Sequence, residues 1–277
     1  MKIAFQGVRG AYSEDALLRH FGAGVQAEGF PFSEQAFDAV ESGRADAGFV
    51  PVENSIAGPV GANADLLLER KVFATAEAYL EVEHCLLGRP GDRLEDVTAV
   101  YSHPIALAQC RGFLNARRAR VVPEYDTAGA AELIAQRGLP GEAAIASRRC
   151  AQVYGLIVLA EGIQNVRNNF TRFLAFRREG DVPPDLKMEK TSVAFRVHHH
   201  PGALLEALAL FAGHAINLTK LESRPIPENP FEYSFFVDLL GGIDGEPVRA
   251  ALAELRASAR HVKVIGSYPL GDRPKPA

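Results

Sequence analysis

A hydroxyl and a guanidinium interrupt an apolar stretch near residue 170, where the chain reads NNFTRFLAF. Burying Thr171 and Arg172 costs free energy unless their polar atoms find hydrogen-bond partners. Thr171 shares a strand face with Phe173, and threonine favours strands in any case. The residues therefore leave two interpretations open: a hydroxyl bonded to the protein's own backbone, or a hydroxyl offered to a ligand. Only the asparagine pair ahead of Phe170 makes a ligand site credible.

Three further polar side chains directly follow the apolar run of DAGFVPV, and they are Glu53, Asn54 and Ser55. Asparagine and serine are common turn residues, so a simple turn is the plain alternative. Gly58 and Gly61 then keep the backbone open to close approach, which favours a loop that binds a ligand.

A polar pair also marks the segment YSHPIALAQC. Ser102 is placed to cap a helix that has Pro104 in its first turn. Gln109 follows Ser102 by about two helical turns and lies on the same face. Taken alone, this pattern favours a structural hydrogen bond, because a buried amide needs a partner.

No residue cluster predicts a metal, a redox centre or a catalytic cysteine. Cys85, Cys110 and Cys150 are far apart and form no C-x-x-C, which indicates packed thiols in a reducing compartment. His198, His199 and His200 are consecutive, so neighbouring side chains would point to opposite faces of a strand. We expect surface or structural roles for these histidines.

Composition excludes several classes of protein. The 277 residues include 47% hydrophobic and 23% charged residues, with a net charge of −4 and a pI near 6.1. This balance favours neither a nucleic-acid partner nor a membrane surface. No run approaches the ~20 apolar residues that span a bilayer, and MKIAFQG reads as a first strand rather than a signal peptide. We therefore expect a soluble, cytoplasmic protein.

Short apolar strands alternate with amphipathic helices through the first part of the chain. KIAFQG, DAGFVPV, TAVYS, RVVPEY and EAAIAS are the expected strands, which predicts an α/β fold with largely parallel sheets. In such a fold, ligands bind where strands end and helices begin, and helix N-termini favour anions. A hydroxyl stands at five of these joints and is expected to cap the helix that follows; these residues are Ser13, Ser33, Ser102, Thr127 and Ser147.

The pattern changes at EGDVPPDLKME, residues 179–189, whose prolines and charges predict a linker. Residues 190–270 then read as strand, helix, two strands, helix and strand. This βαββαβ order is typical of a ferredoxin-like domain. We expect residues 271–277 to be a disordered tail.

Taken together, these segments resemble prephenate dehydratase over almost the whole chain. GVRGAYS, DAGFVPVENSIAG, SHPIALAQC, TAGAA, AAIAS and NNFTRF are similar to the catalytic-domain motifs of that family in their usual order, and GALL, NLTKLESRP and EYSFFVD to its ACT regulatory domain. The resemblance implies a catalytic domain over residues 1–178, with two α/β lobes similar to periplasmic binding proteins and a site in the cleft between them. It implies an ACT domain over residues 190–270.

The resemblance also implies an activity and its regulation. The family converts prephenate to phenylpyruvate with loss of carbon dioxide and water, in L-phenylalanine biosynthesis. Because forming an aromatic ring drives this reaction, no cofactor, metal or covalent nucleophile is needed. The family's ACT domain binds L-phenylalanine at a subunit interface and inhibits the enzyme, which implies a homodimer or homotetramer.

Site residues carry over position by position. Thr171 matches the essential threonine of the TRF motif and would donate a hydrogen bond to the leaving hydroxyl. Arg172 is included as a partner for a carboxylate, although alternation on a strand turns it away from the face of Thr171. The positions expected to bind substrate are Glu53, Asn54, Ser55, Ser102, Gln109 and Arg172. The positions expected to bind L-phenylalanine are Gly202, Ala203, Leu204, Leu205, Asn217, Glu222, Ser223, Arg224 and Pro225.

Two departures from the family pattern leave contacts open. Ala11 stands where the glycine-rich loop usually has a hydroxyl, and Gln164 and Asn165 stand where an aspartate is usual. Two alternative functions also stay open. Arogenate dehydratase would act on the analogue with an amino group in place of the side-chain ketone, and a non-catalytic sensor would bind an aromatic metabolite without turning it over.

Overall fold

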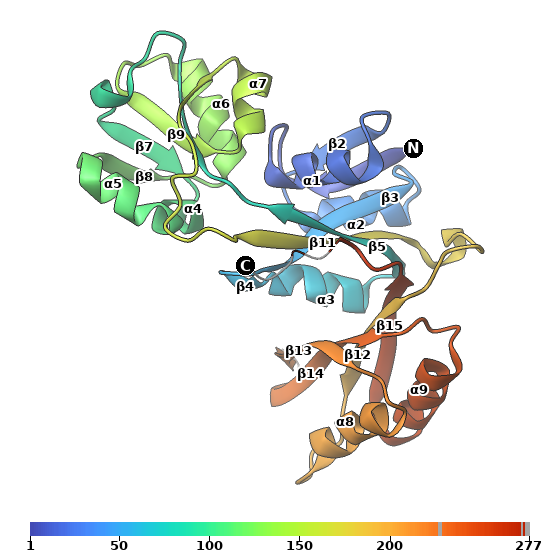
Figure 1. Cartoon of the computed structure of the whole chain (residues 1–277). Helices are drawn as coiled ribbons and strands as arrows, with labels where there is room; N and C mark the ends of the chain where they lie inside the picture. The colour runs from blue at the N-terminus through green and yellow to red at the C-terminus, as the bar shows by residue number, and fades with distance from the viewer. Residues whose placement is uncertain (227–228, 273, 275–277) are drawn as a thin grey trace.

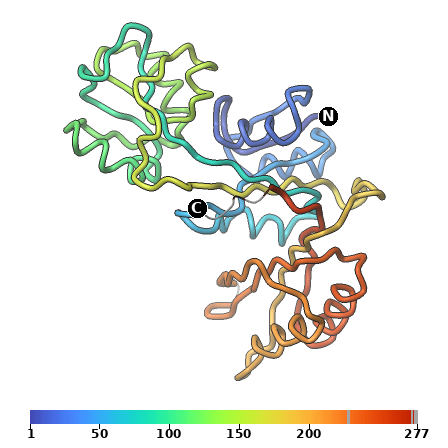
Figure 2. The backbone as a smooth tube through the Cα atoms, in the orientation of Figure 1, coloured from blue at the N-terminus to red at the C-terminus, as the bar shows by residue number. Residues whose placement is uncertain are grey.

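The computed structural model describes residues 1–226, 229–272 and 274. Figure 1 shows two α/β lobes and a C-terminal domain that lies against the first lobe. Two segments of chain connect the lobes, one leading out of β5 and the other leading into β11 (Figure 2). The predicted two-lobed α/β architecture is confirmed.

The first lobe is built on a mixed sheet. The order β5-β11-β3-β1-β2 places β11 between two antiparallel neighbours, so the prediction of largely parallel sheets was wrong for this part. The reversal arises because β11 returns to this lobe from the second one. The elements are β1 (Lys2–Gln6), α1 (Tyr12–Phe21), β2 (Gln26–Phe30), α2 (Ser33–Glu41), β3 (Ala47–Asn54), β4 (Gly58–Pro59), α3 (Gly61–Glu69), β5 (Val72–Glu81) and β11 (Phe170–Arg178).

The second lobe has its own five-stranded sheet, in the order β10-β6-β9-β7-β8. The pairs β7–β8 and β7–β9 are parallel, whereas β6 is antiparallel to β9 and β10. The elements are β6 (Cys85–Gly88), η1 (Leu94–Asp96), β7 (Ala99–Ser102), α4 (Pro104–Gln109), α5 (Arg111–Arg117), β8 (Arg120–Pro123), α6 (Thr127–Arg137), β9 (Glu142–Ala146), α7 (Arg148–Tyr154) and β10 (Ile157–Ala160).

The C-terminal domain confirms the predicted βαββαβ order, with antiparallel strands in the order β13-β14-β12-β15. Its sheet continues into that of the first lobe, because β15 bridges to β5 at Gly266 and Ala74. A side chain at Gly266 would lie 2.3 Å from the Ala74 carbonyl oxygen, so glycine permits this contact. The elements are β12 (Lys190–Arg196), α8 (Ala203–Gly213), β13 (Leu218–Ile226), β14 (Asn229–Leu240), α9 (Glu246–Ser258) and β15 (His261–Tyr268).

The linker and the tail are tied to the body of the protein. A short 3-10 helix, η2 (Glu179–Asp181), opens the predicted linker, and β12 begins at Lys190. The Gly271 N–H donates to Glu77 Oε1 at 3.1 Å, so the predicted disordered tail starts with an anchored residue. Residues 273 and 275–277 of that tail lie outside the described residues.

Aromatic pairs pack against both faces of β11. Phe173 stacks on Phe49 with ring centroids 5.0 Å apart, and Phe176 stacks on Phe37 at 4.1 Å. These pairs bury the two faces of one strand, as the apolar run predicts. The three cysteines are free and buried, which confirms the prediction of packed thiols.

Two further observations concern what the described residues do not form. None of their helices is long and apolar enough to cross a membrane. Within the same part of the chain, no group of three His, Cys, Asp or Glu side chains is arranged to hold a metal ion.

The predicted helix caps were mostly wrong. Only Ser147 acts as predicted, since its Oγ accepts from the Cys150 N–H at 3.2 Å. At the other four joints a neighbouring residue takes the N-cap position, which leaves the predicted hydroxyl to make other contacts. The observed N-cap residues there are Ala11, Phe32, His103 and Asp126.

Candidate functional site

A cleft of about 420 Å³ lies between the two lobes, beside the segments that connect them. Side chains from both lobes and both connections line it, so it is the place where the fold can enclose a small molecule. The polar residues on which the argument below depends are Tyr12, Asn54, His84, Gln109, Asn169 and Thr171.

The Thr171 hydroxyl is held at the cleft with its proton free to be donated. Asn54 Oδ1 accepts the backbone N–H groups of Ile56 at 3.0 Å and Ala57 at 2.8 Å, which fixes the orientation of its amide. Its Nδ2 must therefore donate, and it donates to Thr171 Oγ1 at 3.0 Å. Because the hydroxyl oxygen accepts this bond, its own proton remains available to a ligand.

The orientation of the Asn54 amide in turn fixes those of Asn169 and of Gln109 on the second lobe. Asn54 Nδ2 also donates to Asn169 Oδ1 at 2.7 Å, so Asn169 Nδ2 is the donor to Gln109 Oε1 at 3.2 Å. His84 Nε2 lies 2.7 Å from the same oxygen of Gln109. The Gln109 oxygen is thus engaged from two sides, and its NH₂ group is the part available to a ligand.

Three helices begin at this cleft and make it attractive to anions. Tyr12 opens α1, His103 is the N-cap of α4 and Thr127 opens α6, and all three residues line the cleft. Helix N-termini present unpaired N–H groups and a partial positive charge. The hydroxyls of Ser13 and Thr127, which do not serve as caps, line the cleft as well.

Burial keeps His84 and Tyr12 of the cleft neutral. Desolvation lowers the pKa of His84, and its hydrogen bond with Gln109 offsets this only in part. Desolvation also raises the pKa of Tyr12 well above its ordinary value. Near pH 7 the pair is therefore a neutral imidazole beside a neutral phenol.

Two of the predicted substrate-binding hydroxyls serve the fold instead. Ser102 is fully buried and its Oγ donates to the Ile145 carbonyl at 2.6 Å, while His103 takes the cap position. Ser55 Oγ accepts from the Phe170 N–H at 2.9 Å and so ties β3 to β11. Neither side chain lines the cleft, because both are committed to backbone partners.

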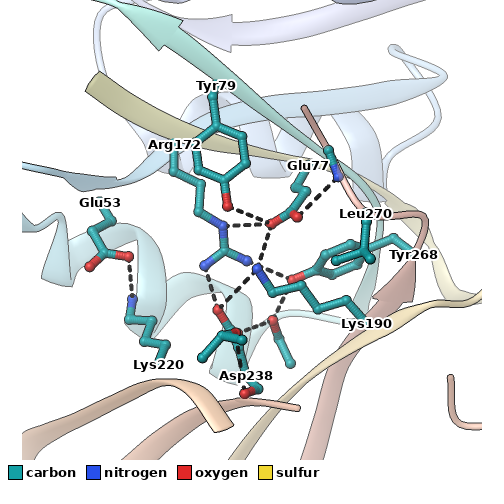
Figure 3. A network of polar contacts seen from close by, with 12 residues as sticks. Glu53, Glu77, Tyr79, Arg172, Lys190, Lys220, Asp238, Tyr268 and Leu270 are labelled. Carbon is teal, nitrogen blue, oxygen red and sulfur yellow. Dashed lines mark hydrogen bonds and ion pairs between the residues drawn. The ribbon is translucent and has the colours of Figure 1, made fainter. Parts of the chain in front are cut away.

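Arg172 is 5% exposed and, unlike Thr171, does not line the cleft. Figure 3 shows its side chain inside a network of polar contacts. Its Nε donates to Glu77 Oε2 at 2.8 Å, its Nη1 to Asp238 Oδ2 at 2.5 Å, and its Nη2 to the Tyr268 hydroxyl at 2.8 Å. The expectation that Arg172 contacts substrate is therefore corrected. Strand alternation directs it to the junction with the C-terminal domain.

Lys190 completes this junction, since its Nζ donates to Glu77 Oε2 at 2.9 Å. Burial alone would raise the pKa of Asp238, but Arg172 and Lys190 outweigh burial and lower it. Each side of the domain boundary thus contributes one buried cation and one buried anion, and two of the ion pairs cross the boundary. We call Glu77, Arg172, Lys190 and Asp238 the junction network.

Glu53 also faces away from the cleft. Its Oε2 lies 3.9 Å from Lys220 Nζ on β13, on the side of the C-terminal domain (Figure 3). The prediction that Glu53 binds substrate is corrected for the same reason as that for Arg172. Asn54 and Glu53 are consecutive on β3 and point to opposite sides.

The predicted phenylalanine-binding residues lie in two places within one chain. Gly202, with φ 88°, caps α8, where Ala203 is buried, Leu204 half-buried and Leu205 exposed. The Asn217 carbonyl accepts from the Leu240 N–H at 2.9 Å, which uses its backbone rather than its side chain.

The ESRP segment, residues 222–225, lies on β13 and faces the first lobe. Arg224 Nε donates to Asp65 Oδ1 of α3 at 2.8 Å, and Lys220 Nζ lies 3.0 Å from the Glu222 carboxylate. Ser223 and Pro225 are exposed on the other side of the strand. Among the contacts recorded for the described residues, none joins this segment to the start of α8.

Sequence reasoning missed Tyr12 and His84. His84 directly precedes Cys85 and contacts Tyr12 and Gln109 at the cleft. A buried polar residue directly ahead of an apolar strand was the available signal. Gln164, at the position where an acid is usual, braces the connection by accepting the His84 N–H at 3.0 Å.

Comparison with known proteins agrees with the two-part organisation. The family model described as prephenate dehydratase matches residues 3–181, and the one described as ACT domain matches residues 191–257. Arogenate dehydratase/prephenate dehydratase 2, chloroplastic, of Arabidopsis thaliana is 41% identical over 283 residues, which are 98% of this chain and 73% of that protein.

Two solved structures are similar over nearly the whole chain. Prephenate dehydratase from Arthrobacter aurescens in complex with L-Phe has a TM-score of 0.90 and 32% identity, covering 100% of this chain and 92% of that one. A quorum quenching acylase, GqqA, has a TM-score of 0.88 and 36% identity, covering 97% of this chain and 98% of that one. Since one fold serves two activities, the chemistry of the cleft must carry the functional argument.

Proposed function

The chain belongs to the prephenate dehydratase family, and from that premise we propose that its cleft converts prephenate to phenylpyruvate under feedback control by L-phenylalanine. The observation that carries the proposal is the Thr171 hydroxyl, which accepts a hydrogen bond from Asn54 and keeps its proton for the cleft. A hydroxyl leaving group needs such a donor where negative charge develops on its oxygen.

The reaction balances with these groups and one proton from the solution. The electron pair of the breaking C–C bond enters the ring as carbon dioxide leaves, and the pair of the breaking C–O bond departs with the ring hydroxyl. Thr171 donates a hydrogen bond to the departing oxygen, and one proton taken up from the solution converts the departing hydroxide to water. Because an alkoxide on threonine would be costly, positioning matters more than full proton transfer.

The remaining carboxylate has suitable partners on the cleft wall. The N-termini of α1 and α6 and the Gln109 NH₂ group supply donors, and together they favour an anion held between the lobes. Contact with both lobes would also withdraw the reacting carboxylate from water, which favours its loss.

Asp126 supports a second candidate substrate, arogenate. Its carboxylate lines the cleft while also accepting the Gly129 N–H at 2.5 Å. An anion there can pair with the ammonium group of arogenate, whereas prephenate has a ketone at that position. The first relative named above is itself described as acting on both classes of substrate.

We predict that Asp126→Asn separates the two substrates. Asparagine still caps α6, so the fold is kept while the charge is removed. We expect kcat/KM for arogenate to fall about tenfold, equivalent to about 1.4 kcal/mol, and kcat/KM for prephenate to stay equal or rise. Steady-state kinetics on both substrates is the measurement, and an equal loss on both would remove Asp126 from substrate selection.

We further propose that the chain assembles as a homodimer or homotetramer in the cytoplasm. Large apolar side chains are exposed on the C-terminal domain, including Leu205 on α8, Leu221 on β13 and Phe231 on β14. A second copy could cover them and bring the start of α8 beside the ESRP segment of its partner. Light scattering with and without L-phenylalanine tests the assembly.

Three free buried thiols suit a reducing compartment, which supports the cytoplasmic location proposed here.

The decisive assay follows phenylpyruvate formation from prephenate by purified protein, without added cofactor and in the presence of a chelator. Turnover that L-phenylalanine suppresses supports both parts of the proposal. Binding of prephenate without turnover would instead support the sensor alternative. No binding and no turnover would reject the proposed substrate.

A further inference from the structure

His84 is a buried imidazole that the reaction above does not use. It is 2% exposed and lies in the first connection between the lobes. Its ring is engaged on both sides, with Nδ1 2.9 Å from the Tyr12 hydroxyl and Nε2 2.7 Å from Gln109 Oε1. A buried ring with two partners needs an arrangement of protons that matches both of them.

The neighbouring residues determine that arrangement. The backbone N–H groups of Ile56 and Ala57 orient Asn54, Asn54 orients Asn169, and the Asn169 amide donates to Gln109 Oε1. Since that oxygen can only accept, His84 Nε2 must carry the proton that it offers to Gln109.

The other ring nitrogen then needs a donor. In a neutral imidazole protonated at Nε2, Nδ1 is an acceptor, and the Tyr12 hydroxyl is the donor within reach. The same hydroxyl donates to the Glu83 carbonyl at 2.9 Å, so its single proton is bifurcated between that oxygen and Nδ1 of the neutral ring. Burial lowers the pKa of His84 and raises that of Tyr12, which keeps both groups neutral.

We propose that Tyr12 and His84 are positioning residues, which hold the Gln109 amide with its oxygen turned inward and its NH₂ group presented to a substrate carboxylate. The inference rests on the proposed function for the identity of the substrate. It concerns Gln109 alone, because the Thr171–Asn54 bond is formed independently of the imidazole.

Removing the Tyr12 hydroxyl tests this role. In Tyr12→Phe the Nδ1 lone pair has no donor, so the tautomer protonated at Nε2 loses a bond that favours it and the tautomer protonated at Nδ1 becomes more populated. The bare Nε2 then faces Gln109 Oε1, and the amide relieves the repulsion by rotating its oxygen toward the substrate carboxylate. We expect KM for prephenate to rise about tenfold or more, since a bond to a charged group is worth about 1.5–3 kcal/mol, and kcat to stay within about threefold.

A nitrogen-15 NMR spectrum of the histidine ring provides a readout that a general loss of stability would not move. Wild type is expected to show a neutral ring protonated at Nε2, and Tyr12→Phe a shift toward protonation at Nδ1. A wild-type ring protonated at Nδ1, or at both nitrogens, would overturn the inference. So would an unchanged KM in Tyr12→Phe.

Two more variants complete the design. Gln109→Glu removes the NH₂ group but keeps an oxygen that accepts from His84 and Asn169, so it should raise KM for prephenate by a similar factor. Adding Tyr12→Phe to Gln109→Glu should raise KM little further. Full additivity would contradict the proposed route. Tyr154→Phe is the matched control, because its hydroxyl donates to the Arg9 carbonyl at 2.7 Å outside the cleft, and it should leave KM unchanged.

The design separates two failures. If wild type does not turn over prephenate, the proposed function fails, while the NMR spectrum still confirms or rejects the ring tautomer. If wild type is active but the tautomer or the KM response is wrong, the inference fails and the proposed function stands.

Discussion

Replacing Thr171 with valine is expected to lower kcat for prephenate by about 10²–10⁴ while KM changes little. Valine has the shape of threonine but no hydroxyl, so the departing oxygen loses its hydrogen-bond donor in the transition state only. An interaction made mainly in the transition state affects kcat rather than ground-state binding. Steady-state kinetics on purified protein gives both constants.

Thr171→Ser is the matched control, because it keeps the donor and should retain turnover to within about tenfold. The valine variant should remain folded, since Asn54 Nδ2 still has the Asn169 side chain and the Phe170 carbonyl as acceptors. We expect its free energy of unfolding to change by about 1 kcal/mol. Near-normal turnover in Thr171→Val would remove the hydroxyl from the mechanism.

Sequence reasoning located the cleft from motifs that lie far apart in the chain. Thr171, Asn54 and Gln109 were each ambiguous alone, and the fold links them through Asn169. The alternation of strands and helices predicted the α/β lobes, and the change at residue 179 anticipated the βαββαβ domain. These elements could be predicted because each has a strong local pattern of apolar and polar residues.

Predictions from local sequence patterns were wrong where long-range packing determines which way a side chain or strand points. The direction in which Arg172 points depends on which face of β11 meets the cleft, and that depends on how the C-terminal domain docks. Ser102 does not line the cleft, because its hydroxyl donates to a backbone carbonyl of β9. The prediction of parallel strands failed at β11, since no local signal reports that a strand returns from the other lobe.

Strand β11 therefore serves two parts of the molecule through neighbouring residues. Thr171 faces the cleft, and Arg172 faces the C-terminal domain. The junction network takes Glu77 from β5, Lys190 from β12 and Asp238 from β14, so it crosses the boundary between the catalytic and ACT domains. Any displacement of the ACT domain must alter the charge balance around the residue next to Thr171.

Asp238→Ala is expected to lower the free energy of unfolding by about 3–5 kcal/mol. The change leaves two buried cations, Arg172 and Lys190, opposite the single carboxylate of Glu77. Water cannot readily solvate the uncompensated charge, because these side chains are no more than 6% exposed. Urea denaturation, followed by far-ultraviolet circular dichroism, measures the loss.

A surface ion pair supplies the control for this effect. Glu246 and Arg249 pair on the exposed side of α9, and Glu246→Ala should change the free energy of unfolding by less than about 1 kcal/mol. Asp238→Asn should fall between the two, since its one amide oxygen keeps an acceptor for either Arg172 or Ser192, whereas the charge and the second acceptor are lost. If Asp238→Ala proved as mild as Glu246→Ala, water would have to reach Arg172, and the junction could not hold β11 by charge pairing.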